Sequence, residues 1–456
     1  MWPVSWSRAV IHSLILVLIS IAPAVAQVDD AITPPPNLVL NNYNTVPVGP
    51  IGGLEGSAYV ARVGDPSAAW FNPAGLARQD TPQISGSAGV YQRTTVATRS
   101  LPDHGGSFQQ LPNFVGFSFA PTPRMTAGAA VITTNAWNQE TDSQLVTPVA
   151  NGQQRFAYSA DSDYERRVLA LGVGFHGTGT WRIGAGVAIS QMSLRLVQSA
   201  SDRIADASGL KSALVTTRVS AFALQVRSQA GVQYDTARWR FGAAIRTPGA
   251  TVYRSGSVTV DGLVDLGSSS TGASLFDADA DAEYHLPWEF QAGAAWSRGL
   301  VEAEVNVLAY SPVAAYSLIS TTQPTITYTD AGTGQPPAIG SKPFSGLTSA
   351  SDGVVDVGAG GHLQLMRNRE VRLHASVASN QSPVAPADDI FTGVDLLTWT
   401  VGVSGAFGKF RFAAGYNHQS GSANDIAFRN LINGRVVTSP VDVTVGAFIY
   451  SLAYQF

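Results

Sequence analysis

The sequence predicts an all-β fold, a transmembrane antiparallel β-barrel of about 14 strands with an N-terminal hatch, or plug, inside its lumen. Three observations predict it. The chain starts with an export signal, and most of the remaining sequence alternates apolar residues with small or polar ones. Short and long connections between the predicted strands also alternate along the chain. The predicted parts are a signal peptide over residues 1–26, the hatch over 27–80 and the barrel over 81–456.

The first 26 residues have the three parts of a secretory signal peptide. Arg8 supplies the positive charge, Ser13–Ile21 is the apolar stretch, and Ala24-Val25-Ala26 provides small residues at a cleavage site. The apolar stretch is about half of the roughly 20 residues that a transmembrane helix needs, so a retained anchor is the weaker interpretation. No cysteine follows the cleavage site, which excludes a lipid-modified N-terminus. We therefore expect the mature chain to be exported.

The composition excludes several kinds of chemistry. The chain has no cysteine, so it can form neither disulfides nor thiolate sites. Only 13% of its residues are charged and its net charge is −4, which gives no electrostatic reason to expect nucleic acid as a partner. Its 7 histidines are scattered without metal-binding spacing, and the sequence has no Gly-x-Ser-x-Gly motif or phosphate-binding loop. We therefore predict no enzyme activity, no cofactor and no metal.

Alternation with a period of two runs from about residue 82 to the C-terminus. Within 222–234 the even-numbered positions are mostly apolar, whereas Gln225, Arg227 and Gln229 occupy odd-numbered positions. A strand with this pattern turns one face to an apolar phase and the other to a polar phase. A soluble β-sandwich can show the same alternation, so the lengths of the connections between strands are needed to distinguish the two folds.

The predicted connections alternate in length along the chain. This order is typical of an outer-membrane barrel, in which short periplasmic turns and long extracellular loops lie at opposite ends. An even number of strands also places both termini on the periplasmic side. Tight turns are expected at Pro121–Arg124, Gly177–Thr180, Asp235–Ala237, Ser297–Gly299, Arg367–Arg369 and Gly408–Lys409. Long polar loops are expected near residues 93–111, 138–165, 198–218, 247–283, 311–352, 379–395 and 419–441.

The apolar face of each strand is expected to point outward, into outer-membrane lipid and lipopolysaccharide, while the charged face lines the lumen. The last strand carries aromatic or apolar residues at every second position and ends in Phe456. A C-terminal strand of this kind resembles the signal that the barrel-assembly machinery recognises when it inserts a protein. The predicted location is therefore the cell outer membrane of a Gram-negative bacterium.

The segment 27–79 does not alternate like the rest of the chain. It contains Pro34-Pro35-Pro36, Gly52-Gly53 and Asn72-Pro73, which favour tight turns and close backbone packing. Such a segment can fold compactly inside a wide lumen, although a periplasmic tail is an equally good interpretation of these residues alone.

The inner part of the segment 27–79 contains a specific motif, in which Asp65 precedes Asn72, Pro73 and Ala74 at a fixed spacing. Weaker elements are Gly56–Tyr59, Leu111-Pro112-Asn113, His285–Trp288 and Tyr454–Phe456. In these motifs and their order the chain resembles, along most of its mature length, the FadL family of long-chain fatty-acid transporters, in which the first motif belongs to the hatch.

The resemblance implies a hatch-filled barrel with a lateral opening, made by a kinked strand near the hatch. Met125–Trp137 is the expected counterpart of this strand, although its sequence has no proline and no clear bulge. The implied function is passive uptake of hydrophobic compounds, either long-chain fatty acids or aromatic hydrocarbons, through an internal pocket, hatch movement and lateral exit. Some barrels with this motif instead act as scaffolds for protein secretion or surface attachment, and a general porin for polar solutes is a third interpretation.

Candidate ligand-binding side chains in the hatch are Trp70, Phe71 and Leu76. They are large and apolar in a segment rich in small residues, so they could line a pocket for a hydrophobic ligand. The alternative is that they anchor the hatch against the barrel wall, and the two roles are compatible.

A fatty acid would also need a cation for its carboxylate. Within residues 181–197 the apolar positions switch from odd to even, and a bulge near Gln191 would explain the switch and turn Arg195 inward. Many inward arginines of a barrel pair with lumenal glutamates, such as Glu302 and Glu304, instead of binding a ligand. The candidate arginines, in order of preference, are Arg195, Arg227 and Arg246.

The stretch 277–283 is rich in carboxylates, which stand at the alternate positions Asp277, Asp279, Asp281 and Glu283. Carboxylates at such a density can bind calcium. The stretch lacks the glycine that shapes a calcium loop, so a solvated acidic strand end is the preferred interpretation.

Overall fold

The computed structural model describes residues 39–98, 105–149, 152–177, 179–207, 209–332, 334, 336–344, 346–366, 370–429 and 436–456. The predicted signal peptide (1–26) and the first part of the predicted hatch (27–38) lie outside the described residues.

The described chain forms one antiparallel sheet that closes on itself, because β1 pairs with both β2 and β20. The strands are β1 (Gln83–Thr98), β2 (Gly105–Thr122), β3 (Met125–Val149), β4 (Gly152–His176), β5 (Trp181–Asp206), β6 (Gly209–Asp235), β7 (Trp239–Arg246), β8 (Ala250–Asp265), β9 (Ser270–Ala282), β10 (Glu289–Arg298), β11 (Val301–Tyr310), β12 (Val313–Ser320), β13 (Pro324–Asp330), β14 (Ala338–Pro343), β15 (Leu347–Ser351), β16 (Val354–Met366), β17 (Val371–Asn380), β18 (Leu396–Phe407), β19 (Phe410–Arg429) and β20 (Val436–Gln455).

These strands build a closed barrel of 14 positions, as predicted. Four positions hold two strands in succession, β7 with β8, β9 with β10, β11 with β12 and β15 with β16. The hairpin of β13 and β14 extends the sheet beside β9. Within the described ranges, helix is confined to α1 (Ala68–Phe71) and the 3-10 turn η1 (Pro73–Arg78). Among the described residues, no helix has the length and apolar character needed to cross a membrane.

Alternate residues point out of and into the barrel. On β6 the odd-numbered residues, from Val219 to Gln233, are mostly buried inside, and the even-numbered ones face outward, which confirms the predicted faces. Large apolar side chains therefore cover much of the outside, where lipid can take the place of water. Exposed examples are Phe117, Val131, Leu171, Ile183, Phe241, Val305, Val401, Phe412 and Leu452.

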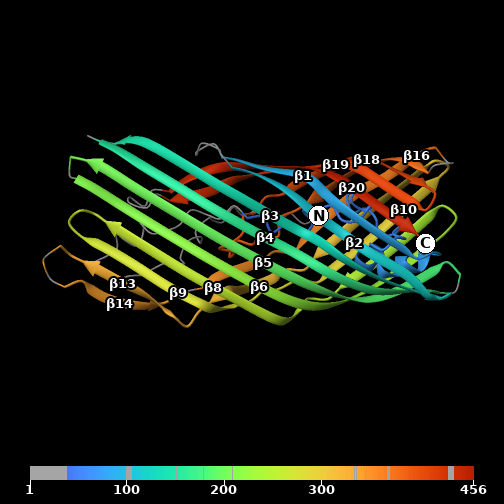
Figure 1. The fold of residues 1–456 in the computed structure, drawn as a ribbon, viewed down its shortest axis with the longest axis horizontal. Coiled ribbons are helices and arrows are strands. Elements are labelled where there is room, and N and C mark those ends of the chain that lie inside the picture. The colour runs from blue at the N-terminus through green and yellow to red at the C-terminus, as the bar shows by residue number, and fades with distance from the viewer. Residues whose placement is uncertain are drawn as a thin grey trace, which may run out of the picture.

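Five of the six predicted tight turns lie close to their predicted positions, at the end of the barrel that holds the C-terminus (Figure 1). The sixth, Arg367–Arg369, lies outside the described residues. Gly179, Gly299 and Gly408 have positive φ angles in three of these turns, a conformation that glycine adopts without steric cost.

The prediction of long loops at the other end is largely wrong. Val149 of β3 pairs with Gly152 of β4, and Asp206 of β5 pairs with Gly209 of β6, so most of the expected loop residues continue the strands. Figure 1 shows these hairpins extending away from the C-terminal end. Beyond a membrane both faces of a strand can be polar, and pairing still satisfies the backbone, so the loss of apolar alternation did not mark the strand ends. Residues 381–395 do remain outside the strands.

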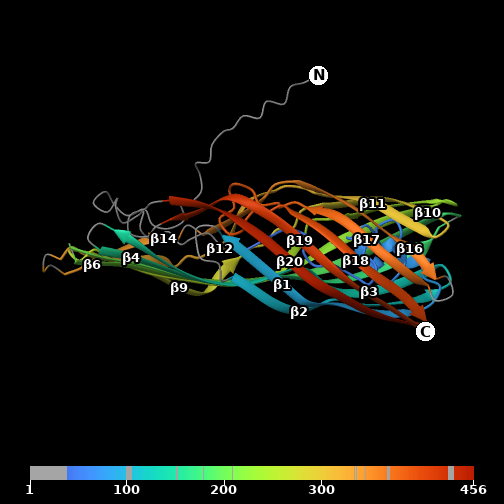
Figure 2. The same ribbon diagram turned by 90° about the horizontal axis from the view of Figure 1, so that it is seen from above.

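Residues 39–79 lie between the walls of the barrel, and Figure 2 shows them in blue among the strands. Their hydrogen-bond partners come from strands far apart around the ring. Examples are Asn306 of β11, which donates to Ser57, and Gln419 of β19, which donates to Thr45. The side chains of this segment are almost all buried. We call residues 39–79 the inner segment below.

Candidate functional site

Asp65 organises the turn that leads into α1. Its carboxylate accepts a hydrogen bond from the backbone N–H of Ser67 at 2.8 Å and one from the Tyr59 hydroxyl at 3.3 Å. Burial raises the pKa of the Asp65 carboxyl, although the hydrogen bonds from Ser67 lower it in part. This member of the predicted hatch motif therefore holds the fold of the inner segment and has no ligand-facing geometry.

Asn72 caps η1 and also ties it to the wall. Its side-chain oxygen accepts a hydrogen bond from the N–H of Ala74 at 3.1 Å, and its amide donates to the carbonyl of Val232 on β6 at 3.0 Å. The wall strands carry glycine where this turn touches them. A Cβ atom at Gly231 would lie 2.0 Å from the Asn72 oxygen, and one at Gly184 would lie 2.3 Å from the carbonyl carbon of Pro73. The Asn-Pro-Ala motif is thus fitted to a groove in the wall.

Trp70, Phe71 and Leu76 are buried where the inner segment meets the wall. They share one apolar cluster with Phe114 of β2 and Ile132 of β3. This position matches the anchoring role given above as the alternative to ligand binding. The cluster is separate from the larger apolar group inside the barrel that is described below.

Arg227 and Arg246, two of the three candidate arginines, meet on Glu289 of β10. Arg246 forms an ion pair with Glu289 and its guanidinium lies 3.7 Å from the centroid of the Trp70 ring. The Arg227 Nη1 atom lies 3.6 Å from the same carboxylate. All four side chains are buried. The structure therefore brings Trp70 and both arginines together, with Glu289 as the partner instead of the lumenal glutamates considered from sequence.

Arg166 of β4 adds a third buried guanidinium that the sequence analysis missed. It donates to the Thr134 hydroxyl and to the carbonyl of Tyr43, both at 2.7 Å. Among the described residues no carboxylate lies within 4.0 Å of it. Together with Arg227 and Arg246 it makes a buried group of three guanidinium groups around the single carboxylate of Glu289. We call these four residues the arginine group; its excess positive charge suits an anionic partner.

The predicted bulge in β5 is wrong. The strand pairs with β4 and β6 without a register shift, so Arg195 faces outward and its side chain is 61% exposed. There it forms an ion pair of 3.1 Å with Asp161, apart from the other candidate residues. The apolar positions change from odd to even because the inside of the barrel itself becomes apolar. Met192, Leu194 and Leu196 point inward, into the lumen.

These inward residues belong to a large apolar group inside the barrel, which we call the inner apolar cluster. It adjoins the arginine group, because Met192 is the cross-strand partner of Arg166. Its members include Val39, Leu40, Trp137, Tyr164, Met192, Leu194, Leu196, Val219, Ala221, Val258, Leu275, Tyr284, Leu318 and Phe391.

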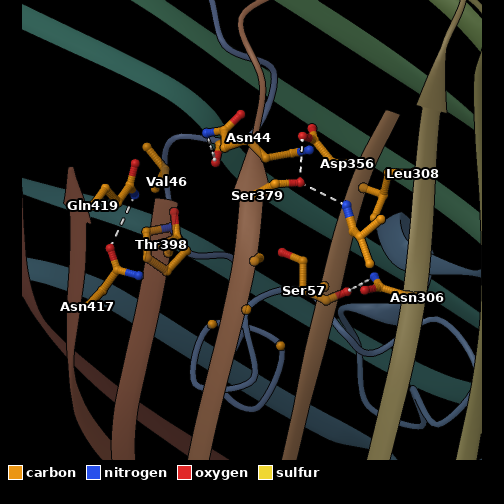
Figure 3. Close-up of a pocket in the computed structure, with 18 residues that line it drawn as sticks. Asn44, Val46, Ser57, Asn306, Leu308, Asp356, Ser379, Thr398, Asn417 and Gln419 are labelled. Carbon is orange, nitrogen blue, oxygen red and sulfur yellow. Dashed lines mark hydrogen bonds between the residues drawn. The ribbon is translucent and has the colours of Figure 1, made fainter. Parts of the chain in front are cut away.

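A polar pocket lies on another side of the inner segment, against β11 and β16 to β19 (Figure 3). Asn306 donates to the carbonyl of Ser57 at 2.7 Å, and Ser379 donates to Asp356 at 3.2 Å. The side-chain oxygens of Asn306, Asn380 and Gln419 are buried with no partner in the described part of the chain. These oxygens make hydrogen-bond acceptors available in this pocket.

The wall changes its pairing where β3 passes the inner segment. The described pairing of β2 with β3 starts at Phe114 and Ile132 and runs toward the tight turn, while β3 stays paired with β4 over its whole length. A register shift lies between Thr133 and Asn135. The strand β3 therefore contains a bulge, which its sequence gave no sign of. Thr134, within this shift, is a partner of Arg166.

The acidic stretch 277–283 is paired with an arginine side chain. Arg254 of β8 pairs with Asp281 at 2.9 Å and with Glu283 at 2.8 Å, and Asp277 accepts a hydrogen bond from Thr321. These side chains are largely exposed, which agrees with a solvated strand end.

Comparison with solved structures finds several barrels of the same fold. The Pseudomonas aeruginosa FadL homologue matches with a TM-score of 0.61 and 14% identity, over 92% of this chain and 99% of that chain. The Pseudomonas putida toluene transporter TodX matches with 0.55 and 12% (92% and 100%), and the Ralstonia pickettii toluene transporter TbuX with 0.53 and 14% (91% and 99%). No protein-family model and no curated sequence matches the chain.

These likenesses establish that the chain has the fold of an outer-membrane barrel of the FadL type, as the sequence resemblance implied. At such low identity they define the fold alone, so the function has to be argued from the site.

Proposed function

We propose that this protein is an outer-membrane channel for the passive uptake of hydrophobic compounds. The observation that carries the proposal is the inner apolar cluster. A water-filled porin lines its lumen with polar residues, whereas here Met192, Leu194 and Leu196 turn apolar side chains inward on a strand that also faces outward with apolar residues such as Ile183. These side chains are buried against one another, so a hydrophobic compound would bind among them, away from water, once neighbouring side chains move aside.

The arginine group favours a ligand with an anionic head. Arg166 lies at the border of the inner apolar cluster, next to Met192, and has only neutral partners. A carboxylate placed there would gain charge-assisted hydrogen bonds while its chain lay among the apolar side chains. We therefore propose long-chain fatty acids as the first class of compound. Aromatic hydrocarbons, the compounds named for the toluene transporters of like fold, are the second.

The proposed route runs from the extracellular end, through the inner apolar cluster, to a lateral exit beside the inner segment. The bulge at Thr134 and the end of pairing between β2 and β3 support an exit at this seam. Movement of the inner segment, acting as a hatch, would open the way. The route requires the end with the tight turns and the C-terminus to face the periplasm.

The test is uptake of radiolabelled oleate and toluene by a deletion strain that carries the wild-type gene or an empty vector. The proposal predicts that the wild-type gene raises the uptake of at least one compound severalfold. The proposal would be wrong if the uptake rates of both compounds were equal with and without the gene while the barrel was present in the outer membrane.

A surface scaffold is the second candidate. The long hairpins of β3 to β6 favour it, because they extend well beyond the part of the barrel that holds the inner segment (Figure 1). It predicts that a secreted or surface protein co-purifies with the barrel and is lost when the tip between β5 and β6 is shortened, while oleate and toluene uptake stay unchanged.

A further inference from the structure

Three potential metal ligands meet where the inner segment touches β16 and β17. His362 and His374 are directly opposite each other in the register of these strands. The Nδ1 atom of His374 lies 2.7 Å and that of His362 lies 3.1 Å from the same oxygen, Oε1 of Glu55. The side chains of Glu55 and His374 are fully buried, and that of His362 is 10% exposed. Carboxylate and imidazole are a common ligand set for divalent transition metals.

Outer contacts orient two of these ligands. Arg62 holds the second carboxylate oxygen of Glu55, which leaves Oε1 to the imidazoles. The Nε2 atom of His374 lies 2.8 Å from the Ser404 hydroxyl. When His374 donates from Nε2 to Ser404, the lone pair of its Nδ1 faces the carboxylate oxygen, and a cation between them is then favourable.

The charge around the ligands also favours a cation. Arg62 lies within 4.0 Å of three carboxylates, those of Glu55, Glu302 and Glu304, and Glu302 shares a second cation, Arg240. With neutral imidazoles the group holds three negative and two positive charges. One further cation therefore reduces the repulsion among buried carboxylates.

We propose that Glu55, His362 and His374 form a binding site for a divalent first-row transition metal ion, with Zn²⁺ as the probe of choice. The ligand atoms lie within 4.8 Å of one another. Tetrahedral zinc with bonds of about 2.0–2.1 Å spaces its ligand atoms about 3.3–3.4 Å apart, so the Glu55 oxygen, now 2.7 Å and 3.1 Å from the two imidazole nitrogens, has to move less than about 1 Å. A bound ion would fasten the inner segment to the wall. The proposal does not depend on the uptake function, because the site is built from other residues.

The main test is isothermal titration of the tag-free, chelator-treated barrel in detergent with Zn²⁺. We expect one ion per chain, with affinity reduced at least tenfold in Glu55→Gln and His374→Gln. The matched control is His418→Gln. His418 packs against Trp399 on β18 and β19, with ring centroids 5.2 Å apart, so its replacement should leave zinc binding unchanged. Equal zinc affinity in wild type, H374Q and H418Q would overturn the proposal.

A second measurement uses the wild-type chain and so does not depend on the folding of a variant. Electron paramagnetic resonance with one equivalent of Cu²⁺ should show hyperfine coupling from two imidazole nitrogens. Coupling to fewer than two nitrogens, or a spectrum of unbound copper, would contradict the site. Uptake by cells that carry Glu55→Gln or His374→Gln keeps the two proposals apart, since loss of zinc binding leaves the inner apolar cluster intact.

Discussion

Two stretches of the same strand, β5, have opposite chemistry on the same face. Near the tight turns the inward positions are Gly184, Gly186 and Ala188, which leave room for the inner segment, whereas further along they are Met192, Leu194 and Leu196. The neighbouring β6 makes the same change, from Gln233 and Gln229 to apolar residues around Ala221. One region of the barrel thus holds most of the inner segment through polar contacts and close backbone packing, whereas the other packs apolar side chains together inside the barrel.

The comparison teaches that the inward face of a barrel need not be uniformly polar. At the level of the inner segment, amide and guanidinium groups satisfy the backbone of residues 39–79. In the other region the inward residues are apolar, and they pack against Val39, Leu40 and Phe391 inside the barrel. We expect a ligand to bind among these side chains. The arginine group lies at the border between the two regions.

Removing Glu289 should have the largest effect on the polar region. Glu289→Ala leaves Arg227 and Arg246 buried without a counter-charge, and breaking a buried pair in this way costs about 3–5 kcal/mol. Urea unfolding of the refolded barrel measures the change. The control is Glu165→Ala, because the partner of Glu165, Arg167, is 52% exposed and exposed pairs contribute about 0–1 kcal/mol. A similar loss of unfolding free energy in both variants would show that the buried ion pairs of Glu289 contribute no more to stability than an exposed ion pair.

A charge in the apolar region should abolish uptake. Leu194→Asp places a carboxylate inside the inner apolar cluster, and we expect uptake of the transported compound to fall by more than about a hundredfold. The neighbouring Arg195 faces outward, so Arg195→Gln should leave uptake unchanged. Equal effects of the two substitutions on uptake would contradict the claim that the inward face of β5 binds the compound and the outward face does not.

Replacing Arg166 should separate the two classes of compound. In Arg166→Gln a bound carboxylate loses a charge-assisted hydrogen bond worth about 1.5–3 kcal/mol, so fatty-acid affinity should fall by about 10- to 100-fold. Toluene, which has no charge, should bind as before. Fluorescence titration with a polyene fatty acid and with the corresponding alcohol provides the measurement. An equal loss for acid and alcohol would assign Arg166 a packing role only.

Loss of the Asn72 side chain should have a smaller effect. Asn72→Ala removes the cap of η1 and its hydrogen bond to β6, at a cost of about 1–2 kcal/mol. The inner segment should then become more sensitive to limited proteolysis while the strands stay intact. Unchanged cleavage would mean that the Asn-Pro-Ala turn does not help to hold the segment in place.

Much of the fold could be predicted because alternation and turn chemistry are local signals. The tight turns, the outward apolar face and the strand count all follow from them. The extended hairpins could not be predicted in this way, since strands such as β3 continue with polar residues on both faces once they leave the apolar layer.

The site was harder to predict, because it depends on which residues the closed sheet brings together. The change of parity in β5 was visible in the sequence, but it signals an apolar interior and not a bulge, and Arg195 consequently faces outward. Arg227 and Arg246 were found from their strand faces. Their meeting with Glu289, and the contacts of Arg166 with Thr134 and Tyr43, follow from tertiary structure that no spacing in the sequence encodes.

The most direct test of the account is a crystal structure of the protein with a bromine-labelled fatty acid, read from the anomalous signal of bromine. The account predicts a bromine peak inside the barrel, beside Met192, Leu194 and Tyr284, with the carboxylate near Arg166. Bromine peaks found only on the outer surface, with none among these side chains, would contradict the claim that the inner apolar cluster receives hydrophobic compounds.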